Sequence, residues 1–132
     1  MEQASPRRGV RGEGKNNLSI RSQAYEEQVT GVNVEESYIV EGVEFDGFHD
    51  GILHDAKGLG YYDLTQTPFG GNVIAEMVDS ANDQLEAVRA AGASTPIRWH
   101  LAEPEMLDLL QDMQRSGDFP AGIELVHTPP DF

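Results

Sequence analysis

The chain has 132 residues, a length typical of one compact domain with its own hydrophobic core. Its charge is uneven: residues 1–24 hold five basic against two acidic residues, a net charge of +3, whereas the remainder holds four basic against 21 acidic residues, a net charge of −17. The absence of cysteine excludes disulfides and cysteine-based zinc sites or nucleophiles, and no apolar run is long enough to predict a membrane span.

The N-terminal part is predicted to contain a flexible lead, a helix and three strands. Residues 1–16 combine glycine, proline and mixed charge, a composition typical of a linker, and we expect residues 17–132 to form a single domain. A helix is predicted over residues 17–29, where Gly31 follows as a stop signal. Strands are predicted over residues 38–41, 43–48 and 52–57.

After a predicted loop over residues 58–62, helices and strands alternate. Apolar side chains at helical spacing predict a long helix over residues 71–91, and a short strand is predicted over residues 96–101. A proline suited to a first helical turn opens a helix over residues 104–114. The last strand is predicted over residues 123–126. This order indicates an α/β fold in which a mixed β-sheet is flanked by helices.

The two strands that meet at Asp50 and Gly51 predict a β-hairpin, because this dipeptide favours a two-residue type I′ turn. With that turn, Asp46 lies opposite Asp55, and side-chain alternation places Lys57 on the same face. Opposed carboxylates repel each other, and a divalent cation would reverse the repulsion because hard cations bind carboxylate oxygens. The hairpin therefore predicts a metal site with a lysine beside it.

Structural roles stay open for several of these residues. Lys57 could pair with Glu44, its predicted cross-strand neighbour, on an ordinary solvated hairpin face. His54 falls on the opposite, apolar face, where a lone histidine is more typical of the core than of a ligand set. Alternation places Trp99 in the core or at its boundary and His100 on the other face, where a structural role is the more common one.

Asp46 and the triplet Asp55-Ala56-Lys57 resemble the PD-(D/E)xK motif of nucleases with the restriction-endonuclease fold. Six segments carry a more specific resemblance: YEEQVTG (25–31), GVEFDG (42–47), DAKGLGY (55–61), PIRWH (96–100), AEPE (102–105) and GIELVHTP (122–129). In this order they resemble the restriction-endonuclease-fold toxin domains at the C-termini of bacterial polymorphic toxins and type VI secretion effectors. The chain departs from that pattern at Asp55, where glutamate is expected, and over residues 61–71, which lack an expected tryptophan-containing segment.

The resemblance implies a restriction-endonuclease-like sheet and a Mg²⁺- or Mn²⁺-dependent DNase. It implies that Asp46 and Asp55 are catalytic metal ligands, together with the carbonyl of Ala56. Lys57 would position or deprotonate the attacking water.

Two further site residues follow from the same resemblance. Glu27 matches a glutamate of the first helix that often completes the metal shell, with Glu26 as the neighbour to test. Gln84 matches a glutamine that contacts the substrate or orients the lysine, while a solvent-facing polar residue on an amphipathic helix is the open alternative.

The resemblance also implies partners and a location. The substrate would be DNA, a cognate immunity protein would bind the domain, and fusion to secretion-apparatus domains would deliver it without an N-terminal signal peptide into the cytoplasm of a target bacterium. The net charge of −17 on residues 25–132 is unfavourable for DNA binding, which usually relies on clustered lysine and arginine. Two alternatives therefore stay open: a catalytically silent module that binds a basic protein partner, and a plain divalent-cation-binding domain.

Overall fold

The computed structural model describes residues 5–8, 20–31 and 36–132, and these form two β-sheets and four helices. In chain order the elements are β1 (Ser5–Arg8), α2 (Ile20–Thr30), β2 (Glu36–Val40), β3 (Val43–Phe45), β4 (Gly47–His49), β5 (Ile52–Lys57), α3 (Tyr61–Thr65), α4 (Gly70–Ala90), β6 (Ile97–Leu101), α5 (Pro104–Ser116) and β7 (Ile123–His127). None of the helices in the described ranges has the length and apolar character needed to cross a membrane.

The larger sheet has the strand order β4-β5-β6-β7 and mixes strand directions. β4 is antiparallel to β5, whereas β5, β6 and β7 are parallel. Each parallel step is bridged by helix, because α3 and α4 lie between β5 and β6 in the chain and α5 lies between β6 and β7. A smaller antiparallel sheet has the order β1-β2-β3. The prediction of a mixed sheet flanked by helices is confirmed.

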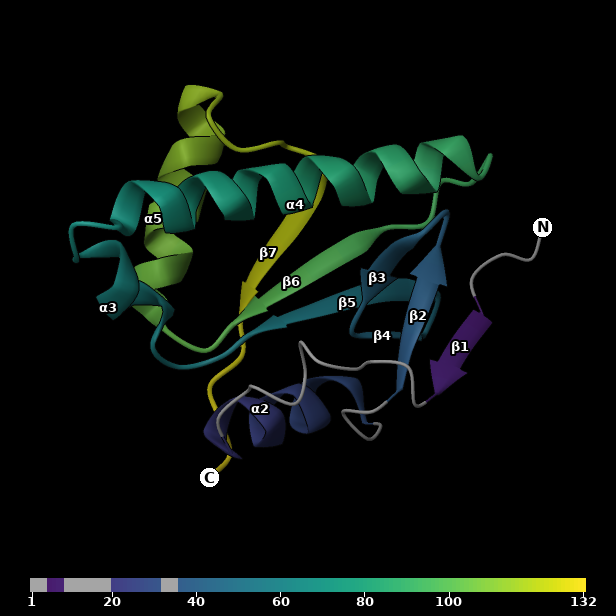
Figure 1. Cartoon of the computed structure of the whole chain (residues 1–132), viewed down its shortest axis with the longest axis horizontal. Helices are drawn as coiled ribbons and strands as arrows, with labels where there is room; N and C mark the ends of the chain where they lie inside the picture. The colour runs from purple at the N-terminus through teal and green to yellow at the C-terminus, as the bar shows by residue number, and fades with distance from the viewer. Residues whose placement is uncertain (1–4, 9–19, 32–35) are drawn as a thin grey trace.

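Helices cover both faces of the larger sheet. Figure 1 shows α4 along one face and α2 on the opposite side. Alternate side chains of β5 reach these two layers: Leu53 belongs to the main core beneath α4, and Ala56 packs with Tyr25 and Val29 of α2. Because β5 is covered on both sides, residues 53–55 are buried in succession.

Two local predictions were wrong. The strand predicted over residues 43–48 is divided at Asp46, because β3 pairs with β2 while β4 pairs with β5. Residues 61–65 form α3 in place of the end of the predicted loop. The carboxylate of Glu103 explains α3, since it accepts hydrogen bonds from the amides of Gly60 (3.0 Å) and Tyr62 (2.9 Å) at the start of the helix.

Part of the predicted N-terminal lead is a strand. Ser5–Arg8 pairs antiparallel with β2, with Ser5 opposite Ile39. The other residues of that lead, and residues 17–19 of the predicted first helix, lie outside the described part of the chain.

Candidate active site

A tight turn at Asp50 and Gly51 joins β4 to β5. Their φ angles are +57° and +77°, as a type I′ turn requires. The ladder pairs His49 with Ile52, Phe48 with Leu53 and Gly47 with His54. The predicted turn and its register are confirmed.

Asp46 lies at the break between β3 and β4, one residue beyond that ladder. Its amide donates to the carbonyl of His54 (3.0 Å), and its carboxylate Oδ2 accepts a hydrogen bond from the amide of Ala56 (2.8 Å). The predicted regular pairing of Asp46 with Asp55 is therefore wrong. The segment before Asp46, β3, pairs with β2, and pairing with β5 begins only at Gly47. The carboxylate of Asp46 is still anchored to the backbone of β5, one residue from Asp55.

Asp55 is only 6% exposed, and both of its carboxylate oxygens have partners. Oδ1 accepts from Nζ of Lys57 at 2.9 Å, and Oδ2 accepts from Nε2 of Gln84 on α4 at 2.7 Å. The alternative in which Lys57 pairs with Glu44 is wrong; Glu44 accepts a hydrogen bond from the hydroxyl of Ser37 (3.1 Å). The motif lysine and the motif aspartate thus form a buried ion pair.

The electrostatics of this pair follow from burial and from the second aspartate. Burial raises the pKa of Asp55 above its ordinary value and the charge of Asp46 adds to the rise, while Lys57 and Gln84 act in the opposite direction. Burial alone would lower the pKa of Lys57, but Asp55, Tyr61 and Asp46 together outweigh burial and raise it. Asp55 therefore bonds the ammonium group of Lys57 directly, and the charge of Asp46 also favours its protonated form.

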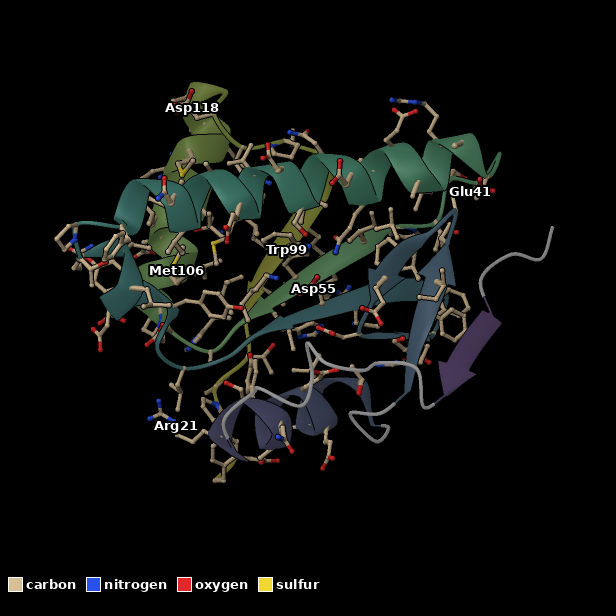
Figure 2. All side chains as sticks on the ribbon, viewed as in Figure 1. Arg21, Glu41, Asp55, Trp99, Met106 and Asp118 are labelled. Carbon is tan, nitrogen blue, oxygen red and sulfur yellow. The ribbon has the colours of Figure 1, made fainter. Side chains whose placement is uncertain are left out.

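The indole ring of Trp99, on β6, packs against the ammonium group of this ion pair. Its side chain is fully buried, and Nζ of Lys57 lies 4.5 Å from the centroid of its rings. Its indole N–H donates to Oε1 of Gln84 at 2.8 Å. Figure 2 shows Asp55 and Trp99 together beneath α4. The solvent-facing alternative for Gln84 is wrong, since Gln84 is 1% exposed.

The oxygen donors of this site fit a divalent cation. The donors predicted from the sequence resemblance are the carboxylates of Asp46 and Asp55 and the carbonyl of Ala56, and oxygen donors are the type that Mg²⁺ and Mn²⁺ prefer. A carboxylate oxygen has about two acceptor positions, so the bonds from Lys57 and Gln84 leave acceptor capacity on Asp55. Because burial and Asp46 both disfavour the charge on Asp55, a cation between the two aspartates would stabilise it.

Glu27 is not brought to these residues. Its side chain is exposed on α2, whereas its neighbour Glu26 is 5% exposed. α2 packs on the face of β5 that carries Ala56, and Gln84 approaches Asp55 from α4 on the other face. Within the described ranges, no three His, Asp or Glu side chains lie close enough together to hold a metal ion. The assignment of Glu27 as a ligand stays a prediction.

His49, His54 and His100 lie on the α2 side of the sheet. His54 is 2% exposed, and its Nδ1 lies 2.8 Å from Nε2 of His100. His100 in turn contacts the hydroxyl of Thr128 at 2.8 Å, and the ring of His49 stacks on that of His54. Burial lowers the pKa of both His54 and His100, that of His100 to about 4. The prediction that His54 is a core or boundary residue is confirmed, and His100 lies on the face of β6 opposite to Trp99, as predicted.

The role of Trp99 is what the sequence analysis missed. Its burial was predicted from strand alternation, but its contacts with Lys57 and Gln84 were not. Strand alternation could have indicated these contacts. Once β5 and β6 are known to be adjacent, Trp99, the sole tryptophan, is predicted on the same face of the sheet as Asp55.

Comparison with known proteins adds a family relationship. Residues 22–104, more than half of the chain, match the family model described as Restriction endonuclease fold toxin 5. The match runs from α2 to the first residue of α5 and so contains Asp46, Asp55, Lys57, Gln84 and Trp99. No curated protein gave a significant match.

Proposed function

The chain belongs to the restriction endonuclease fold toxin family, and from that membership we propose that it is a metal-dependent deoxyribonuclease. The observation that carries the proposal is the position of Asp55. Its buried carboxylate accepts hydrogen bonds from Lys57 and Gln84, and the carboxylate of Asp46 accepts one from the amide of the next residue, Ala56. Two carboxylates and an ammonium group in this arrangement are the parts that hydrolysis of a phosphodiester with a bound cation needs.

Each residue has a defined task in the proposal. Asp46, Asp55 and the carbonyl of Ala56 would hold Mg²⁺ or Mn²⁺, which supplies Lewis acidity toward the phosphate and lowers the pKa of bound water. Lys57 presents an ammonium group that offsets negative charge developing on the phosphate and orients the attacking water. Gln84 holds Asp55 from the side of α4, which restricts the carboxylate to one orientation.

The family relationship also supports a toxic role. We propose that the domain acts on DNA in the cytoplasm of a target bacterium, that type VI secretion domains deliver it, and that its producer makes an immunity protein against it. The toxin description of the family supports the first part; delivery and immunity rest on the resemblance of the six sequence segments. Expression of the chain alone should kill bacteria, and co-expression of the immunity protein should restore growth.

The first test is cleavage of supercoiled plasmid by purified protein in Mg²⁺ or Mn²⁺. We expect nicking that EDTA stops and that Asp46→Ala, Asp55→Ala or Lys57→Ala reduces at least about 100-fold. Asp108→Ala removes an exposed carboxylate from α5 and is the matched control, which should cleave like the unsubstituted protein. Cleavage that survives in Lys57→Ala would contradict the role given to the lysine.

One observation favours a second candidate function. Residues 25–132 carry the net charge of −17, which suits a silent module of the same fold that binds a basic protein. A folded protein that cleaves neither duplex DNA, single-stranded DNA nor RNA in either metal would favour that module over the nuclease.

A further inference from the structure

Trp99 contacts both groups that hold Asp55. Its indole N–H donates to Gln84, whose amide nitrogen donates to Oδ2 of Asp55. The face of its rings lies under the ammonium of Lys57, which bonds Oδ1 of the same carboxylate. One fully buried side chain on β6 therefore contacts a donor on each side of the motif aspartate on β5.

The indole N–H determines which way the Gln84 amide faces. An indole can only donate a hydrogen bond, so the amide oxygen of Gln84 must point to Trp99 and the NH₂ group must point to Asp55. Turned over, the amide would place its oxygen against a carboxylate oxygen. Because Gln84 is 1% exposed, water is not at hand to replace either partner. The orientation of the amide is thus fixed by Trp99 and not by Asp55 alone.

The indole face also contributes to the position of Lys57. A cation within about 6 Å of an aromatic centroid is attracted to the ring face, and more strongly where it is removed from water. Nζ of Lys57 is 4.5 Å from Trp99 and 5.9 Å from Tyr61, and the side chain is 13% exposed. The lysine therefore has an aromatic wall that holds its ammonium beside Asp55.

We propose that Trp99 is a positioning residue of the active site, which orients Gln84 through its N–H and Lys57 through its ring face and thereby fixes Asp55 in the geometry for catalysis. The catalytic part of this proposal rests on the proposed nuclease function. The contact part does not, since it concerns an arrangement of the protein alone.

Trp99→Phe tests the catalytic part, because it keeps an aromatic face and removes the N–H. We expect kcat for plasmid cleavage to fall about 10- to 100-fold, as for other groups that orient a metal ligand, with KM changed less than about threefold. Gln84→Met should cause a similar fall. If Trp99 acts through Gln84, the double variant falls no further than the more damaged single variant.

Phe119→Leu is the matched control for disturbed packing. Phe119 is 2% exposed and packs edge-on against Trp99, with ring centroids 5.4 Å apart, so this change perturbs the same core while leaving the N–H in place. It should cleave within about twofold of the unsubstituted protein. A Trp99→Phe protein that is folded and cleaves at the unsubstituted rate would overturn the proposal, as would effects of Trp99→Phe and Gln84→Met that multiply.

The contact itself is tested without any cleavage. Trp99 is the only tryptophan, so its indole N–H gives a single, assigned NMR signal. We expect that signal to exchange slowly with solvent, and in Gln84→Met to shift and exchange faster. An unchanged signal would overturn the proposal whether or not the protein is a nuclease, whereas a shifted signal in a protein that never cleaves would remove only the proposed function.

Discussion

The pairing of Asp55 with Lys57 decides what removal of the aspartate does to stability. From the sequence, two opposed aspartates predict that removal of one relieves repulsion. In the structure, Asp55 accepts hydrogen bonds from both Lys57 and Gln84, and breaking a buried pair leaves an uncompensated charge. The repulsion from Asp46 is the smaller effect, because Lys57 acts on Asp55 more strongly than Asp46 does.

We therefore predict that Asp55→Asn destabilises the metal-free protein. Lys57 and Gln84 bond different oxygens of Asp55, and an asparagine replaces one of these oxygens with an NH₂ group that can only donate. A loss of about 3 kcal/mol is expected for such a broken pair. The measurement is urea unfolding in EDTA, with Asp108→Asn as the exposed control. A variant as stable as the unsubstituted protein would mean that the ion pair contributes nothing.

At the scale of secondary structure elements, the sequence predicted what depends on local pattern. β5 and α4 were placed within one residue because their own apolar spacing and turn residues define them. The division at Asp46 depends on β2 competing with β5 for the same segment, and α3 depends on Glu103, more than 40 residues away. The choice between exposure and burial of Gln84 likewise depends on Trp99 of another element. Single-sequence patterns contain no information on such contacts.

The histidine pair links β5, β6 and the segment after β7, and its chemistry predicts a pH dependence. Burial lowers the pKa of His100, and charges on His54, Arg98 and His49 lower it further, while Glu124 acts in the opposite direction. Between pH 6.5 and about 4, the unfolded chain binds a proton at His100 that the folded chain does not. The free energy of unfolding therefore falls as the pH falls through this window.

We predict that His100→Gln reduces this acid sensitivity. Between about pH 7 and about pH 5, the unsubstituted protein should lose on the order of 1 kcal/mol more stability than the variant, once solvent screening is allowed for. Urea unfolding at the two pH values measures the difference, and all other titrating groups are common to both proteins. Equal losses would show that His100 does not titrate on unfolding.

At the scale of the whole molecule, most of the Lys and Arg side chains that the structure describes are paired with acids. Arg89 pairs with Glu86, Arg115 with Asp112, Arg98 with Glu124 and Lys57 with Asp55. Of the Lys and Arg side chains that the structure describes, Arg21 alone has no ion pair. It is exposed at the start of α2 (Figure 2), and its Nη2 lies 3.9 Å from where a Cβ on Gly60 would be. Gly60 is three residues after Lys57, so Arg21 is an unpaired cation beside the end of the motif strand.

A chain with so many acidic residues can still bind DNA if Arg21, the one cation without an ion pair among the described side chains, meets a phosphate near the site. We therefore predict that Arg21→Gln raises KM for plasmid about fivefold with little change in kcat, and lowers the slope of log affinity against log salt by about 1, the value for one lost phosphate contact. Arg115→Gln removes the same charge from the far helix α5, where Arg115 is already paired with Asp112, and should alter neither quantity. If both substitutions weaken binding equally, only net charge matters and Arg21 makes no phosphate contact. If neither does, the phosphate contacts come from elsewhere in the chain.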